Sequence, residues 1–117
     1  AAEALVRRAA EYVEQAARAQ LEDVRQGRST TAETENLLVQ SSIAIAEAKI
    51  AATESAIHVA QKLYDVGGAA TTQKPFNFDR HWRNARTHTT HDSVAYKYKA
   101  IGNFLLNGEP PPITFTY

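Results

Sequence analysis

The feature that most limits the fold of this 117-residue chain is a long amphipathic run near its middle. Within residues 31–65, apolar side chains recur at alternating spacings of four and three, which is the periodicity of an α-helix. One stripe comprises Val39, Ile43, Ala46, Ile50, Thr53, Ile57, Ala60 and Tyr64. A second stripe comprises Leu38, Ile45, Ala52, Ala56, Val59 and Leu63. A helix with two apolar stripes has to be covered on two sides, so we predict the central helix of a bundle or a helix at a subunit interface.

Capping signals predict where the first two helices begin and end. Thr30-Thr31-Ala32-Glu33 has a hydroxyl followed three residues later by a carboxylate, so the long helix is expected to start there and to continue to about Asp65. The alanine-rich residues 1–26 predict an earlier helix that ends at Gly27. Because the sequence opens in helical periodicity without a capping residue or a methionine, we expect the chain to begin inside a helix of a longer protein.

The segment after the long helix predicts a loop and a third helix. Gly67-Gly68 interrupts the helical pattern, and residues 67–78 contain the glycine, asparagine and proline that are typical of a loop. Long ordered loops often have a function. The third helix is expected to be capped by Asn77 or Asp79 and to run to about His91.

The end of the chain predicts a fourth helix over 94–106, capped by Asp92 or Ser93. Asn107-Gly108 stops this helix, and the three prolines that follow prevent its continuation. The last five residues are apolar and aromatic, so we expect them to dock on the bundle or on a neighbouring subunit. The whole pattern predicts one all-α domain over 1–117, a bundle of about four helices with one long central helix.

The composition narrows the classes of function. The 13 basic and 13 acidic residues balance, which argues against a general nucleic-acid-binding protein. Residues 1–65 have an excess of three negative charges and residues 66–117 an excess of three positive charges, so the C-terminal part can attract an anion. The chain contains no cysteine, which suits a reducing cytosol and excludes thiolate chemistry. No apolar run is long enough for a membrane span.

The candidate chemistry is concentrated in the predicted third helix. One face of that helix would present His81, Asn84, His88 and His91, with Arg80, Arg83 and Arg86 beside it. Such a polar stripe fits a solvated surface helix whose side chains are satisfied. It also fits the wall of an active site that faces an anionic ligand, and the clustering of three of the four histidines favours this second interpretation.

A metal site is the other chemistry that histidines at this spacing suggest. His88 and His91 could supply two ligands, with Asp92 or His81 as a third. Asp92, however, points about 100° away from His91 on a continuous helix, and the nearby arginines would repel a cation. We therefore predict no metal.

The glycine pair has two interpretations as well. A glycine pair followed by small residues such as Ala69 and Ala70 exposes backbone N–H groups that can bind a phosphate. Gly-Gly is also an ordinary way to end a helix.

Two segments together resemble the C-terminal helical domain of the acyl-CoA dehydrogenase superfamily. They are Tyr64-Asp65-Val66-Gly67-Gly68-Ala69 and Asp79-Arg80-His81-Trp82-Arg83-Asn84-Ala85-Arg86-Thr87-His88. The continuation Arg86-Thr87-His88-Thr89-Thr90-His91-Asp92 is similar to the flavin-dependent monooxygenase branch, most closely to the dibenzothiophene and sulfone-type monooxygenases. Residues 64–117 carry this resemblance, and residues 1–63 match only in helical layout.

The resemblance implies roles for individual residues. True dehydrogenases of the superfamily have a catalytic glutamate near Asp92, and this sequence lacks it, which argues against α-proton abstraction. In the monooxygenase branch His91 would contact the isoalloxazine and assist the formation or protonation of a flavin C4a-hydroperoxide, and His88 would position it. An imidazole, which titrates near neutrality, is suited to that proton transfer. Gly68, Ala69 and Ala70 would contact the flavin, although some relatives have an arginine at position 70.

The resemblance further implies an N-terminal helical domain and a middle β-domain, without which we expect no catalysis. It implies a homotetramer. The composition adds the expectation of a cytoplasmic protein with no nucleic-acid or membrane partner. Reduced FMN from a separate flavin reductase, with O₂, would oxidise a sulfur or nitrogen atom of a small hydrophobic substrate, as in desulfurization. The alternatives are an acyl-CoA dehydrogenase-like oxidoreductase that uses FAD and a non-catalytic oligomerisation bundle.

Overall fold

The computed structural model describes residues 1–112, and all regular secondary structure within that range is helical. The elements are α1 (Ala2–Arg25), α2 (Ala32–Gly67), the short 3-10 helices η1 (Ala69–Thr72) and η2 (Lys74–Phe76), α3 (Asp79–His91) and α4 (Val94–Asn107). The predicted all-α class with four helices is confirmed. No helix within the described range is long and apolar enough to cross a membrane. The expected docking of the tail concerns residues 113–117, which lie outside the described part.

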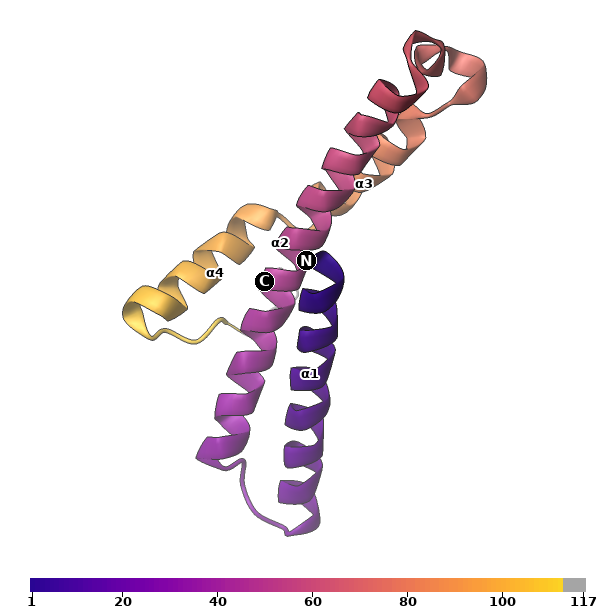
Figure 1. Ribbon diagram of the computed structural model, residues 1–117. Helices are drawn as coiled ribbons and strands as arrows, with labels where there is room; N and C mark the ends of the chain where they lie inside the picture. The colour runs from indigo at the N-terminus through magenta and orange to yellow at the C-terminus, as the bar shows by residue number, and fades with distance from the viewer. Residues whose placement is uncertain (113–117) are drawn as a thin grey trace.

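The long helix α2 forms the axis of the molecule, as Figure 1 shows. It has 36 residues and is therefore about 54 Å long. α1 runs back along its N-terminal half and α3 along its C-terminal half, while α4 packs against it from another side. The described chain measures 63 × 29 × 23 Å, and α2 is the central helix that its two apolar stripes predict.

The two stripes of α2 have different surroundings in the single chain. In the first stripe Ile43 and Ile50 are buried beneath the neighbouring helices. In the second, Ile45 and Val59 are 47% and 67% exposed. The contact between α1 and α2 is built from small side chains, namely Ala9 with Ala44 and Ala48 of α2, which belong to neither stripe, and Leu5 and Tyr12 pack against them. One apolar face is thus covered within the chain and the other is largely open.

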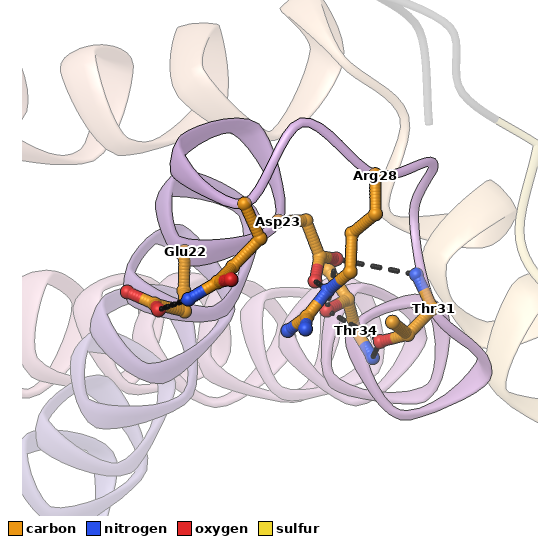
Figure 2. Close-up of polar contacts among 6 residues, drawn as sticks. Glu22, Asp23, Arg28, Thr31 and Thr34 are labelled. Atoms are coloured by element: carbon orange, nitrogen blue, oxygen red, sulfur yellow. Dashed lines mark hydrogen bonds and ion pairs between the residues drawn. The ribbon is translucent and has the colours of Figure 1, made fainter.

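The turn between α1 and α2 is organised by a buried carboxylate that the sequence pattern did not indicate. Asp23 is 3% exposed, and its Oδ2 accepts hydrogen bonds from the Thr34 hydroxyl at 2.7 Å and the Thr31 backbone N–H at 3.2 Å (Figure 2). Its Oδ1 accepts from Arg28 Nε at 2.8 Å. The bond from Thr34, followed by that from Arg28, lowers the pKa of Asp23. The buried charge is therefore fully paired, and it closes the α1–α2 hairpin.

The same contacts move the predicted cap of α2 by one residue. Thr31 occupies the N-cap, and its hydroxyl accepts the Thr34 backbone N–H at 3.2 Å. The prediction of a box over Thr30–Glu33 was wrong in register, because Thr34 rather than Glu33 occupies the third position, where it reaches Asp23. A neutral hydroxyl can be buried there with two partners, whereas a glutamate would bring a second negative charge beside Asp23.

The predicted cap of α3 is also wrong, because Phe78 is the N-cap residue of that helix. Ser93, one of the two residues predicted for α4, does occupy its N-cap, but neither helix has a side-chain cap bond. The side chains of Asn77 and Asp79 instead accept hydrogen bonds from the Arg83 guanidinium, at 3.1 and 2.9 Å. α4 ends at Gly108 in the left-handed conformation, as expected.

Each glycine of the pair after α2 has a separate structural reason. A Cβ atom at Gly67 would lie 2.0 Å from the Thr71 Cγ2 atom, so only glycine fits beside that buried threonine. Gly68 has a φ of +69°, which favours glycine, and its carbonyl accepts the Thr71 hydroxyl at 2.7 Å. The expected loop is therefore a compact turn built from η1 and η2.

Candidate functional site

The predicted histidine stripe lies along one exposed flank of α3. Ala85 and Thr89 form the covered side of this helix, while His81, His88 and His91 are exposed. His88 and His91 are three residues apart in the last turn, so they are neighbours on the same flank. The structure thus leaves both imidazoles accessible to a ligand or to another protein segment.

This flank borders the open stripe of α2. His81 and Asn84 line a shallow groove of about 660 Å³. Its α2 side is formed mainly by small and apolar residues, namely Ala52, Ser55, Ala56, Val59, Ala60 and Leu63. The groove therefore places a mostly apolar wall beside the histidine flank, an arrangement that suits a flat aromatic group or a second helix.

The arginines do not all stand beside the histidines. Arg86 lies on the other flank of α3, where its Nη1 donates to the Thr89 hydroxyl at 3.1 Å and it borders a cleft of about 410 Å³ with Glu54. Arg83 is paired with Asp79 at 2.9 Å. The expectation of three arginines along the histidine stripe is therefore wrong for Arg86.

Asp92 follows the histidine pair directly, and its carboxylate lies between two lysines. Its Oδ2 is 2.8 Å from Lys49 Nζ on α2 and 3.2 Å from Lys97 Nζ on α4. Lys49, and to a smaller degree Lys97, lowers the pKa of this carboxyl. Asp92 is therefore not the N-cap of α4, a position that Ser93 occupies; it is the C-cap residue of α3. Because its pKa is lowered, this carboxylate is also a weak proton-abstracting base, which fits the absence of the dehydrogenase glutamate.

The predicted flavin-binding turn lies at the opposite end of α3 from His91. Gly68 ends α2, and Ala69 and Ala70 begin η1; all three are exposed. α3 has thirteen residues, so its two ends are roughly 20 Å apart. A single chain consequently does not bring Gly68, Ala69 and Ala70 together with the histidine pair.

No metal centre is apparent in the part of the chain that the structure describes. Within residues 1–112 there is no group of three or more His, Cys, Asp or Glu side chains that could hold an ion. The Asp92 carboxylate, which was weighed as a third ligand, is occupied by the two lysines.

Sequence reasoning missed both lysines of this cluster. Lys97 is 4% exposed, which is rare for lysine unless it is paired. The available signal was Lys49, which stands between the buried residues Ala48 and Ile50 of α2. A lysine at such a position indicates a buried partner, but the sequence does not reveal which one.

The chain is an all-helical domain that is organised around one long helix and has an exposed histidine flank on α3. Residues 1–96 match the family model described as the acyl-CoA dehydrogenase C-terminal domain. The chain belongs to this family.

Relatives within the family include flavin-dependent oxygenases. The chain is 42% identical over 87 residues to dibenzothiophene monooxygenase from Mycolicibacterium goodii, covering 74% of this chain and 20% of that protein. It is 41% identical over 73 residues to the probable FMNH2-dependent monooxygenase SfnC from Pseudomonas putida, covering 62% of this chain and 18% of that protein. The chain thus spans about a fifth of the length of these relatives.

Solved structures give the same relationship. The FMN-bound TdsC from Paenibacillus sp. A11-2 aligns with a TM-score of 0.66 and 33% identity, covering 99% of this chain and 30% of that one. Methanesulfinate monooxygenase MsuC from Pseudomonas fluorescens aligns with a TM-score of 0.65 and 34% identity, covering 97% and 29%.

Proposed function

We propose that this chain is the C-terminal domain of a two-component flavin-dependent monooxygenase. The complete enzyme would use O₂ and reduced FMN, supplied by a flavin reductase, to oxidise a sulfur or nitrogen atom of a small hydrophobic substrate. The observation that carries the proposal is the accessible pair His88 and His91 at the end of α3, in a chain whose relatives are named as FMNH2-dependent or FMN-bound monooxygenases.

In this proposal the two histidines have different tasks. His91 gives or takes a proton at the flavin, and His88, one turn earlier on the same flank, supports its orientation. An imidazole is suited to this because its proton transfer occurs near neutral pH. The paired Asp92 counts against the alternative of an acyl-CoA dehydrogenase-like FAD enzyme, because that reaction needs a free base at this place.

Gly68, Ala69 and Ala70 would contact a flavin, with Ala69 and Ala70 offering backbone N–H groups, since the Gly68 N–H already donates to the Tyr64 carbonyl at 2.9 Å. Because this turn lies roughly 20 Å from His91 along α3, a ring held by His91 of one chain is out of its reach. We therefore propose that the turn serves a flavin bound mainly by another copy. The open apolar stripe of α2, with Ile45 and Val59 exposed, supports such an assembly, and we propose a homotetramer.

We also propose that the complete enzyme is located in the cytoplasm. Reduced flavin is consumed by O₂, so it has to be made close to the oxygenase that uses it. The flavin reductase and the oxygenase would therefore share one compartment.

The test is His91→Phe in the intact enzyme, assayed with reduced FMN, O₂ and an aromatic sulfide. We expect oxygenation to fall at least about 100-fold, the scale of a lost general acid or base, while the tetramer seen by size-exclusion chromatography persists. His58→Phe is the matched control, because His58 is an exposed histidine of α2 outside the proposed site. Unchanged turnover in His91→Phe would overturn the assigned role.

A further inference from the structure

Three charged side chains from three different helical segments meet at the corner between α3 and α4. Lys49 belongs to α2, Asp92 is the residue that follows α3, and Lys97 belongs to α4. Their side chains are 14%, 22% and 5% exposed. We call this group of three residues the corner anchor.

The corner anchor holds the end of α3 at two chemical groups. Lys49 Nζ donates to the Asp92 carboxylate at 2.8 Å and also to the Asp92 backbone carbonyl at 2.9 Å. That carbonyl belongs to the C-cap residue of α3, where a cation is favoured by the helix dipole. One lysine of the central helix therefore fixes both the side chain and the backbone at the residue that follows His91.

The charge balance of the anchor is not that of a simple stabilising pair. Two ammonium groups share one carboxylate oxygen, and the buried Asp92 Oδ1 has no hydrogen-bond partner among the described residues. Removing charges from water is costly, and packed apolar residues often replace a buried ion pair without loss of stability. Three apolar side chains could hold this corner together, but they would not fix its geometry through directed bonds.

We propose that the corner anchor positions the histidine turn, residues 88–91, for the flavin chemistry of the proposed function, on which this inference rests. The anchor residues are positioning residues, because they act through α3 and not on the reacting atoms. In the histidine turn only Thr89 is buried, while His88, Thr90 and His91 are exposed, so the residue where α3 ends is a second point that fixes its placement. A shift of about 1 Å in a reacting group can cost on the order of 100-fold in rate.

The experiment compares Lys49→Met, Lys49→Arg and Lys62→Met in the intact enzyme. Methionine keeps the length of the lysine side chain without its charge, and arginine restores donors for both Asp92 groups. Lys62→Met is the matched control, because Lys62 is a 61% exposed lysine of α2 whose partner, Asp65, lies at 3.0 Å.

The first measurement is the amount of oxygenated product divided by the amount of hydrogen peroxide released. Both amounts are determined in samples that contain the same amount of bound flavin. For Lys49→Met we expect this ratio to fall about tenfold as the histidine turn moves, with partial recovery in Lys49→Arg and no change in Lys62→Met. A change that only reduced the amount of folded enzyme would leave the ratio unchanged. An unchanged ratio in Lys49→Met therefore overturns the inference.

The second measurement is hydrogen–deuterium exchange of the amides in the histidine turn, which needs no activity. We expect faster exchange there in Lys49→Met than in Lys62→Met, and equal exchange would overturn the anchoring itself. A wild-type enzyme that performs no oxygenation would overturn the proposed function, while the exchange result would still decide whether the anchor holds this turn.

Discussion

The α1–α2 turn and the α3–α4 corner each surround one ionised carboxylate, but they are built from different partners. Asp23 is bound by two hydrogen-bond donors of the residues that follow it and by the half-exposed Arg28, all within eleven residues of sequence. Asp92 is bound by two lysines, one of which lies 43 residues earlier in the chain. The first carboxylate closes a local hairpin, whereas the second joins three helical segments.

This difference indicates which part of the molecule depends on each carboxylate. The contacts of Asp23 can form as soon as α1 and α2 meet, and they lie at the far end of α2 from the histidine flank. The contacts of Asp92 form only when α2, α3 and α4 are all in place. We therefore expect changes at Asp23 to alter the stability of one hairpin, and changes at Asp92 to alter both stability and the site.

The largest effect is expected for Asp92→Asn. Two buried ammonium groups would then face a neutral amide, so the free energy of unfolding should fall by about 3 kcal/mol, the low end for breaking a buried ion pair. Urea denaturation followed by circular dichroism at fixed protein concentration measures this. Wild-type stability in the variant would mean that the lysines find other partners.

A smaller effect is expected for Thr34→Val, which removes the hydroxyl that donates to Asp23 and keeps the shape of the side chain. The thermal midpoint should fall by about 5 °C, since a buried acceptor loses a charge-assisted hydrogen bond. Thr87→Val is the control, because the Thr87 hydroxyl is exposed and donates only to the Arg83 carbonyl. Equal midpoints for the two variants would contradict a special role for the Asp23 contacts.

The smallest effect is expected in the acid dependence of stability. The pKa values of Asp23 and Asp92 are both lowered on folding, so their contribution is complete above the ordinary carboxyl value of 3.8 and is lost as the pH falls through the lower folded value. Unfolding midpoints measured from about pH 6 down to about pH 3 should therefore decline less steeply in Asp23→Asn than in the wild type. Parallel curves would show that Asp23 is not linked to folding.

Periodicity was sufficient to predict the four α-helices of the described chain, although not the two short 3-10 helices in the predicted loop. The spacing of the apolar positions in residues 31–65 predicted a long central helix, and α2 spans Ala32–Gly67. Helix ends were predicted less well, because a cap depends on what else the side chain can reach. Asp92 was predicted as an ordinary helix cap and Thr34 was not singled out, yet each is bound to a partner in another segment.

The candidate site was predictable only in part, for the same physical reason. The shared flank of His88 and His91 follows from helix geometry, and both lie exposed in α3. The groove beside that flank, the separation of Gly68 from His91 and the lysines around Asp92 depend on how α3 packs on α2. Such contacts between distant segments leave no regular spacing in the sequence.

The contact between Gly67 and Thr71 decides how mutations in the turn after α2 should be interpreted. Alanine at position 67 would overlap the threonine methyl group, so a loss of activity in Gly67→Ala would report a damaged helix end whether or not flavin binds nearby. Ala70 is exposed and lies in a regular turn. Larger side chains introduced at Ala70 are therefore the informative probes of ligand approach. At Gly67, the double variant Gly67→Ala with Thr71→Ser would separate steric damage from lost binding, because serine lacks the methyl group that the alanine would overlap.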